Sequence, residues 1–432
     1  MNDKKETSFY IHTLGCKVNA YESYALGEEL KSLGYDKTNK KDGADILILN
    51  TCSVTGKADA KSRQHLSSMR KASPSGTLLV MGCHSQSHGQ ECLEAGADIV
   101  LGASSRHKAI PYIEAFLSTR EKILDVKANM RHEDYEELGT FSFGENSRAY
   151  LKIQDGCDNF CSYCYIPFLR GNSRSRLPGK VIAEAIALHK IGYKEIILTG
   201  IHLGGYGKDL GDGSYRLAEL IKAILEAVPS LFRLRISSIE ESEIDDHLLD
   251  VLAAYPQVVS HLHIPLQSGS PTVLARMKRK YDTDAFLKKL EKIRSIRPEI
   301  AITTDVIAGF PNETDEEWAE TLAFCQKCRF AEIHVFPFSP RPHTFAATLP
   351  DLSPEIKKKR VAELLALSKK LRLAYEEQFY GRDMEVLFED YDKEKQIAYG
   401  HTSNYLKVEV SSPSPRHGEI GIIKYSPQTA SD

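Results

Sequence analysis

Three cysteines stand close together in the segment Asp155-Gly-Cys-Asp-Asn-Phe-Cys-Ser-Tyr-Cys-Tyr165. Cys157, Cys161 and Cys164 have the spacing C-x3-C-x2-C. Iron–sulfur clusters are usually held by four cysteines, so this set of three predicts a [4Fe–4S] cluster with one iron open to another ligand. The alternative is a structural zinc site. Zinc takes four nitrogen or sulfur donors, commonly in two spaced pairs, and no fourth Cys or His stands at a matching distance.

Length and composition limit the class of protein. A chain of 432 residues should contain two or three domains. The start of the chain is polar and no apolar run could span a bilayer, so we expect a cytoplasmic protein without a membrane segment. We also expect a monomer. Nine cysteines without an export signal indicate metal or redox use. The net charge is only −3, so binding of nucleic acid would need local basic patches.

Residues 1–128 alternate short apolar runs with helical patterns, which predicts an α/β domain with a parallel sheet. Cys16, Cys52 and Cys83 each follow the end of a predicted strand. Because such loops meet at the carboxyl edge of a parallel sheet, we expect the three thiols to form a second three-cysteine cluster site. The alternative is three unrelated buried cysteines. The predicted strands are Phe9–His12, Ile46–Asn50, Leu78–Met81 and Ile99–Leu101, and the predicted helices are Asn19–Leu33, 58–71 and 108–117.

Residues 129–146 are polar and aperiodic and are predicted to be a linker. A second βα series runs from Arg148 to about Pro350, within a predicted domain of residues 147–375. Its six units predict a partial (β/α)6 barrel with the Cys157 loop at its mouth. The predicted strands are Tyr150–Gln154, Glu195–Thr199, Leu234–Ser237, His261–Leu266, Ile300–Ile307 and Glu332–Phe336.

A long amphipathic helix is predicted at Pro354–Tyr380, and the pattern changes after Gly381. The C-terminal domain is placed at residues 376–432. Its short alternating strands predict a small antiparallel barrel of the OB-like type, a fold that often binds RNA. These strands are Met384–Phe388, Ile397–Gly400, Leu406–Val410 and Ile420–Ile423.

Three separated motifs resemble those of the radical S-adenosylmethionine (SAM) methylthiotransferases, and the resemblance covers nearly the whole chain. Thr13-Leu-Gly-Cys-Lys-Val-Asn-Ala-Tyr-Glu-Ser23, with Asn50-Thr-Cys-Ser-Val-Thr55 and Gly82-Cys83, resembles the auxiliary-cluster domain of that family. Asp155–Arg176 resembles its radical-SAM signature. Gly400-His-Thr-Ser-Asn-Tyr-Leu-Lys-Val408 resembles its TRAM domain, which contacts tRNA.

The resemblance implies two [4Fe–4S] clusters and SAM as cofactors. Cys157, Cys161 and Cys164 would hold the cluster that binds SAM, and Cys16, Cys52 and Cys83 the auxiliary cluster. It also implies that SAM cleavage yields a 5′-deoxyadenosyl radical that attacks an adenine C2–H bond, and that a methylthio group is then transferred. This chemistry requires an electron donor of the flavodoxin or ferredoxin type and a sulfur donor that the sequence does not identify.

Within this family the sequence is most similar to the enzymes that act on N6-threonylcarbamoyladenosine at tRNA position 37. Isopentenyladenosine enzymes tend to read Gly-Cys-Gln-Met-Asn, and ribosomal-protein enzymes Gly-Cys-Pro-Lys-Asn, where this chain has Gly15-Cys-Lys-Val-Asn19. The stretch Gly200-Ile-His-Leu-Gly204 also favours the threonylcarbamoyladenosine branch. The alternatives are an isopentenyladenosine substrate, a ribosomal-protein aspartate, or a non-catalytic RNA-binding protein with structural metal sites.

Further residues are predicted to contact SAM or the anticodon stem-loop of tRNA. An ordinary strand-end hydrogen bond is the alternative for each polar SAM residue. The arginines after the Cys157 loop could contact phosphates, whereas the run from Lys357 to Arg360 is better explained as a solvated helix face. Cys92, Cys325 and Cys328 have no equivalent placement, and a structural role is favoured for Cys325 and Cys328. The predicted SAM contacts are Gly200, Gln267, Ser268, Arg279, Asp305 and Ile307, and the predicted RNA contacts are Arg170, Arg174 and Arg176.

Overall fold

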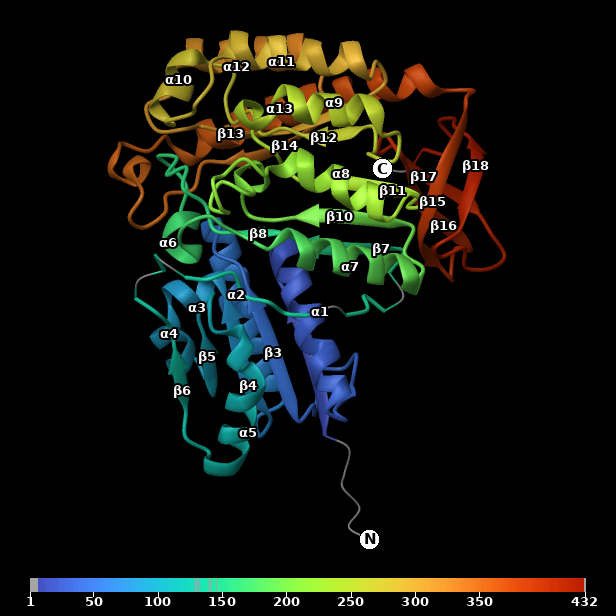
Figure 1. Cartoon of the computed structure of the whole chain (residues 1–432). Helices are drawn as coiled ribbons and strands as arrows, with labels where there is room; N and C mark the ends of the chain where they lie inside the picture. Colours follow the sequence, from blue (N-terminus) through green and yellow to red (C-terminus); the bar gives the residue numbers. More distant parts are fainter. Residues whose placement is uncertain (1–6, 129, 132, 140, 145, 431–432) are drawn as a thin grey trace.

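The computed structural model describes the whole chain except residues 1–6, 129, 132, 140, 145 and 431–432. Four positions of the predicted linker therefore lie outside the described residues. In Figure 1 the N-terminal sheet (blue to cyan) lies below the central strands and helices (green to orange), and the C-terminal sheet (red) lies at one side. Within the described part of the chain, no helix combines the length and the apolar character that crossing a membrane needs.

The N-terminal sheet has six parallel strands in the order β2-β1-β3-β4-β5-β6. The prediction of a parallel α/β domain is confirmed. β2 and β6 were not predicted, because strands of two or three mostly accessible residues carry no hydrophobic pattern. The strands are β1 (Ser8–Thr13), β2 (Asp36–Lys37), β3 (Ile46–Thr51), β4 (Thr77–Gly82), β5 (Ile99–Leu101) and β6 (Ile123–Asp125).

Helices cover both faces of this sheet, as an apolar parallel sheet requires. Ile46 and Ile48 of β3 pack with residues of α1 and α5, whereas Leu47 and Leu49 pack with residues of α2. The alternation of side chains along the strand produces these two cores. The helices are α1 (Lys17–Ser32), α2 (Gly56–Ala72), α3 (Cys83–Ser87), α4 (Gly89–Glu94) and α5 (Ala109–Thr119).

Six parallel strands form the partial barrel. They are arranged as two three-stranded sheets, β11-β10-β7 and β12-β13-β14. Two isolated bridges, one of which pairs Ser238 with His263, join β11 to β12, so the strands follow one another in chain order. β12 ends at His263 and not at Leu266 as predicted; Pro265 has no N–H for the ladder. The strands are β7 (Arg148–Lys152), β10 (Glu195–Thr199), β11 (Arg233–Ile236), β12 (His261–His263), β13 (Ala301–Ala308) and β14 (Glu332–Pro337).

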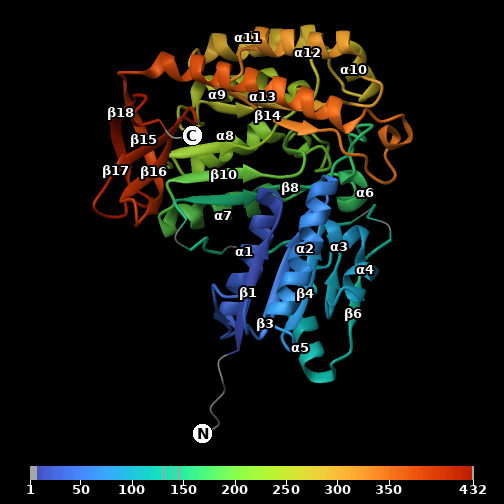
Figure 2. The same ribbon diagram turned by 180° about the vertical axis from the view of Figure 1, so that it is seen from behind.

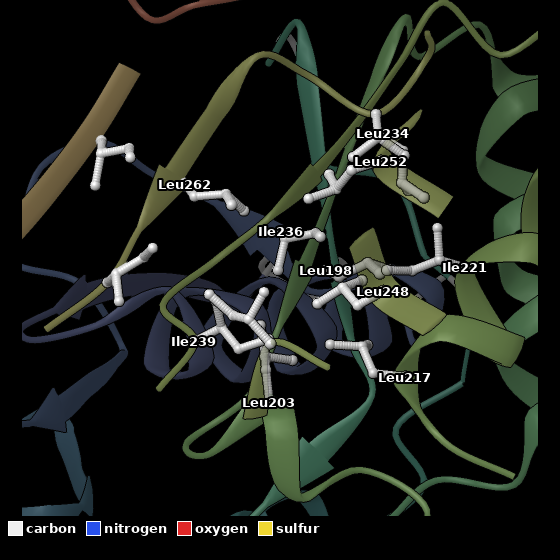
Figure 3. Packing of buried hydrophobic residues seen from close by; sticks show 14 of the residues in the cluster. Leu198, Leu203, Leu217, Ile221, Leu234, Ile236, Ile239, Leu248, Leu252 and Leu262 are labelled. Carbon is white, nitrogen blue, oxygen red and sulfur yellow. The ribbon is translucent and has the colours of Figure 1, made fainter. Parts of the chain in front are cut away.

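The helices of this series pack on the outside of the strands. Figure 3 shows Leu234 and Ile236 of β11 within an apolar cluster that includes Ile221 of α8 and Leu248 of α9. Since strand side chains alternate, Arg235 between them points to the inside of the barrel, where it lines a cavity. The helices are α7 (Pro178–Ile191), α8 (Leu217–Ala227), α9 (Asp246–Ala254), α10 (Pro271–Arg276), α11 (Thr283–Ile296), α12 (Asp315–Cys328) and α13 (Pro354–Glu376).

The C-terminal sheet is antiparallel, as predicted, and has the order β17-β16-β15-β18. It packs against the first residues of the barrel strands, at the end away from the cysteine loop. There, Arg233 donates from Nη1 to the backbone oxygen of His401 (2.9 Å), and Arg148 pairs with Glu389 (2.6 Å). Figure 2 shows this sheet beside the barrel from behind. The strands are β15 (Asp383–Asp392), β16 (Ile397–Thr402), β17 (Lys407–Ser411) and β18 (Ile420–Lys424).

Short elements complete the fold. A two-stranded antiparallel ladder and a short helix flank the loop of Cys157. These are β8 (Gln154–Asp155), β9 (Arg174–Ser175) and α6 (Ile166–Arg170), and the 3-10 helices are η1 (Arg106–Lys108), η2 (Leu203–Gly205), η3 (Glu241–Glu243), η4 (Phe345–Thr348) and η5 (Glu377–Phe379).

Candidate active site

The first cysteine triad, Cys157, Cys161 and Cys164, lies in the loop between β8 and α6, beyond the first barrel strand. The three side chains are partly buried. Gly156 precedes them with a φ of +71°, and a Cβ atom there would lie 1.9 Å from the backbone oxygen of Asn172. Only glycine permits this close approach, which sets the direction in which the loop leaves β8.

Two charged pairs contact the first triad. Arg279 donates from Nη1 to Sγ of Cys161 (3.4 Å) and forms an ion pair with Glu240. Nε2 of His202 lies 2.8 Å from Oε1 of Glu243. Burial lowers the pKa of His202, but hydrogen bonds with Cys157 and Glu243 raise it to about 9. These groups place positive charge beside thiolates, the form in which cysteine binds a metal.

The second triad, Cys16, Cys52 and Cys83, follows β1, β3 and β4, which are neighbours in the sheet. A Cβ atom on Gly15 would lie 3.2 Å from Sγ of Cys52, so the loops after β1 and β3 touch. Burial raises the pKa of Cys83 to about 11, and the nearby thiols of Cys52 and Cys16 add to the rise. The predicted convergence of these cysteines is therefore present, with Cys16 the most exposed of the three.

Two cavities lie beside the loops that carry the triads. One, of about 660 Å³, is lined by Cys52 and by Val335–Ser339 at the end of β14. The other, of about 170 Å³, is lined by Tyr163 of the first triad's loop. The two cavities share Thr55 and Phe336–Ser339. Cys52 of the second triad and the loop of the first triad thus border one connected space at the barrel mouth.

Three of the predicted SAM residues line the smaller cavity: Gln267, Asp305 and Ile307. Arg279 lies instead against Cys161. The hydroxyl group of Ser268 is used in hydrogen bonds with Thr321 and with the backbone N–H of Ser270, which is the strand-end alternative.

Gly200 follows β10. A Cβ atom there would lie 2.9 Å from Oε1 of Gln154. The backbone at Gly200 therefore closely approaches β8, the strand that precedes the first triad.

The structure contradicts the prediction that the arginines after the first triad face RNA. Arg170, Arg174 and Arg176 expose 0%, 6% and 3% of their surface. Arg176 pairs with Glu137 (2.8 Å) and with Glu184. Guanidinium groups are suited to buried pairing with carboxylates, and these carboxylates come from segments that the sequence does not place beside the arginines.

Arg170 belongs to a buried ionic network. Its Nη1 donates to Glu22 on α1 (2.9 Å) and to Asp155 on β8 (3.1 Å). Nζ of Lys152 contacts the same two carboxylates, at 3.1 and 2.7 Å. Burial raises the pKa of Glu22, but Arg106, Arg170 and Lys152 together lower it to about 2. Buried ion pairs therefore join Glu22 of the N-terminal domain to Arg170 and Lys152 of the barrel, which also pair with Asp155.

The same network reaches both cysteine triads. Nη2 of Arg170 donates to Oδ1 of Asn19 (2.7 Å), and Nδ2 of Asn19 donates to the backbone oxygen of Thr51 (3.0 Å), next to Cys52. On the other side, Oδ1 of Asp155 accepts from the N–H of Gly156 (2.8 Å), next to Cys157. Arg170 is thus a positioning residue: its contacts hold the loop of Cys52 and the loop of Cys157 in place relative to each other.

Replacing Arg170 by Met should destabilise the reconstituted protein by about 3–5 kcal/mol, because removing one partner leaves buried carboxylates undercompensated. The free energy of unfolding in urea, measured anaerobically, tests this. Arg63, which is exposed, provides the control substitution Arg63→Met. A loss below about 1 kcal/mol, the range of surface ion pairs, would show that the network does not fix the domain interface.

The remaining cysteines lie in hydrophobic cores. Cys92 packs in the core beneath α2, and Cys325 and Cys328 of α12 pack in the barrel core. The run from Lys357 to Arg360 was expected to be a solvated helix face. Arg360 is instead buried and forms an ion pair with Glu313 (2.6 Å).

Sequence reasoning missed His202, Glu240, Glu243 and Tyr163 as neighbours of the first triad. His202 stands in a stretch singled out for its resemblance alone, Gly200–Gly204. The signal that could have identified Glu240 is its position just after β11, at the barrel mouth.

A partial (β/α)6 barrel with a C-x3-C-x2-C loop at its mouth defines the radical SAM class of enzymes. The family described as "Radical SAM superfamily" matches residues 151–325, and "Uncharacterized protein family UPF0004" matches residues 8–102. Among solved structures, the radical S-adenosylmethionine methyltransferase TsrM from Kitasatospora setae has a TM-score of 0.59 at 13% identity, covering 79% of this chain and 77% of TsrM. This likeness concerns the fold.

Curated relatives define the family more closely. The threonylcarbamoyladenosine tRNA methylthiotransferase MtaB of Bacillus subtilis is 43% identical, over 96% of this chain and 92% of the relative. MtaB of Thermotoga maritima is 37% identical, over 92% and 90%. The tRNA-2-methylthio-N(6)-dimethylallyladenosine synthase of Bacillus velezensis is 35% identical, over 96% and 83%. The chain belongs to the radical SAM methylthiotransferase family.

Proposed function

We propose that this protein is a tRNA methylthiotransferase that adds a methylthio group to C2 of N6-threonylcarbamoyladenosine at position 37. The observation that carries the proposal is that Cys52 of the second triad and Tyr163 of the first triad's loop line two cavities that share Thr55 and Phe336–Ser339. The high identity to MtaB, over nearly the full length of both chains, favours the threonylcarbamoyladenosine substrate.

The two donor sets fit two iron–sulfur clusters. Each offers three thiols, which are soft ligands suited to such clusters. In this proposal Cys157, Cys161 and Cys164 hold the cluster that binds SAM, and Cys16, Cys52 and Cys83 hold the auxiliary cluster. When bound, the first cluster supplies the electron that cleaves SAM, and the second provides a site for the transferred sulfur.

The surrounding residues bind and orient the reactants. Gln267, Asp305 and Ile307 line the smaller cavity and would hold SAM there. Arg279 keeps a positive charge at Cys161 through its pair with Glu240. Phe336–Phe338 give the space that the two cavities share an apolar wall.

We assign the domains as residues 1–128 for the auxiliary cluster, 147–375 for the SAM cluster and 376–432 for a TRAM-like domain that contacts tRNA. The protein acts as a cytoplasmic monomer, and it receives electrons from a flavodoxin- or ferredoxin-like donor.

Exposed aromatic rings near the first triad offer a surface for unpaired bases. Phe160 and Phe168 are 44% and 42% exposed, and their ring centroids lie 5.9 Å apart. Phe345, 55% exposed, has Nζ of Lys278 5.7 Å above its ring. Proteins recognise bases of single-stranded RNA by stacking them on such side chains. This surface, not the buried arginines, fits the anticodon loop.

Lys57 and Lys61 are exposed and line the larger cavity, beside Cys52. Replacing both by Ala should weaken tRNA binding and reduce the salt dependence of log K by about 0.7 per lost phosphate contact. The measurement is tRNA affinity across a salt series. Lys369→Ala with Lys370→Ala, on the exposed side of α13, is the charge-matched control. An unchanged slope in the Lys57 and Lys61 variant would exclude this edge from the RNA interface.

The proposed function is tested by mass spectrometry of nucleosides in tRNA from cells with and without this protein. Loss of the 2-methylthio derivative of N6-threonylcarbamoyladenosine in the deletion strain, and its return on complementation, would support the proposal. Loss of the 2-methylthio derivative of isopentenyladenosine instead would assign the other tRNA substrate. Unchanged tRNA, with a change in a ribosomal protein, would contradict a tRNA substrate.

A further inference from the structure

A polar cavity of about 420 Å³ occupies the inside of the partial barrel. Its size lies in the range typical of ligand sites, about 300–1,000 Å³. It shares Asp305 with the smaller cavity of the active site, so the two meet at this residue. Its lining residues come from all six strands and from Ser237 and Ser238, which follow β11. Lys17 of the N-terminal domain and Tyr405, between β16 and β17, complete the lining.

The lining of this cavity carries three cations, Lys17, Arg148 and Arg235, and one carboxylate, Asp305. Of the three cations on its wall, Arg148 is paired with Glu389 (2.6 Å) and Arg235 with Glu195 (2.5 Å). Lys17 has no ion-pair partner among the described residues, and the residue is exposed. Nη1 of Arg235 is buried and has no hydrogen-bond partner in the described part of the chain. An anionic group placed here would meet one unpaired ammonium group and one free guanidinium N–H.

The cavity also has polar groups for an uncharged part of a ligand. Oγ of Ser237 and Nδ1 of His261 are without partners among the residues that the structure describes. The ring of Tyr405 lies at the end formed by the starts of the strands, where it stacks with His261 at 4.7 Å and lies under Arg235 at 4.8 Å. A ligand group would therefore enter from the end at Asp305, which is the active-site end.

A metal ion is the competing occupant, because ligand atoms of His263, Asp305 and His334 lie within 4.8 Å of one another. Asp305 is already 3.3 Å from Nε2 of His263. The positive charges of Lys17 and Arg235 on the same wall disfavour a cation. The balance of charge thus favours an anion.

The position of Lys17 relates this anion site to the substrate. Lys17 begins α1 and is bonded to Cys16 of the second triad. A base whose C2 atom lies between the two triads would therefore place a substituent within reach of Lys17. We propose that this cavity binds the threonylcarbamoyl group of the substrate base, with Lys17 and Arg235 recognising its carboxylate and thereby selecting this base. The inference rests on the proposed function and names the residues of its specificity.

The test compares two anticodon stem-loops that carry N6-threonylcarbamoyladenosine at position 37, one with the free carboxylate and one with the carboxylate converted to a carboxamide. The affinity of reconstituted protein with SAM is measured for each. The wild type should prefer the carboxylate by about ten- to a hundredfold, the range of hydrogen bonds to charged groups. Lys17→Gln should lose most of this preference, whereas Lys17→Arg should keep it.

Lys31→Gln is the matched control, because it removes the same charge from the exposed end of the same helix. The wild type and the variants Lys17→Gln, Lys17→Arg and Lys31→Gln must have equal iron content. A Lys17→Gln variant that retains the preference, or that weakens both stem-loops equally, would overturn the inference. Failure of the proposed function is separate: in that case the wild type would form no methylthio product on the carboxylate stem-loop.

Discussion

Replacing Cys157, Cys161 and Cys164 together by Ala is expected to abolish SAM cleavage and to remove about half of the iron. The wild type should contain about eight irons and eight sulfides per chain, and the variant about four of each, if each triad holds one [4Fe–4S] cluster. Among the described residues that line the smaller cavity, beside the first triad's loop, there is no cysteine. The measurements are iron and sulfide content after anaerobic reconstitution and the yield of 5′-deoxyadenosine.

Cys325→Ala with Cys328→Ala is the control, since both thiols lie in the barrel core. It should leave the iron content unchanged, although buried truncations reduce stability. A wild-type content near four irons would show that one triad holds no cluster. One zinc per chain would contradict the assignment of the triad that binds it.

The fold was predictable wherever a local pattern decides it. β3 and β4 are continuous apolar runs bounded by polar turns, and they are buried along their whole length. The convergence of Cys16, Cys52 and Cys83 followed from the geometry of parallel strands, because every loop at their carboxyl ends reaches the same edge.

The arginines were mispredicted because proximity in sequence does not tell which way a side chain points. Arg170 follows the first triad closely, but α6 turns it toward Glu22, which lies 148 residues earlier in the chain. Glu184 likewise meets Arg176 only after α7 has packed on the barrel. Partners of buried charges are therefore set by tertiary packing, which no periodicity in the sequence reports.

The two triads should be separable by mutation. Replacing Cys16, Cys52 and Cys83 together by Ala should leave SAM cleavage intact while methylthiolation of tRNA stops. The physical reason is that the two sites are held by different domains and share no thiol: the second triad sits on loops of the N-terminal sheet, whereas the first depends on the Gly156 turn and the Arg279–Glu240 pair. The measurements are 5′-deoxyadenosine yield and methylthio nucleoside yield from the same reaction.

The matched control is Cys92→Ala, which removes a buried thiol from the same domain without touching the edge of the sheet. It should reduce stability only and leave both yields near those of the wild type. If the second-triad variant still formed methylthio product at the wild-type yield, those cysteines would not carry the sulfur. If it lost SAM cleavage as well, the network through Asn19, Arg170 and Asp155 would couple the two sites, because Asn19 stands beside Cys16 and Asp155 stands beside the first triad. Arg170→Met, measured in the same assay, distinguishes such coupling from a direct role of the second-triad cysteines in SAM cleavage. If the network couples the two sites, Arg170→Met changes both yields although all six cysteines remain.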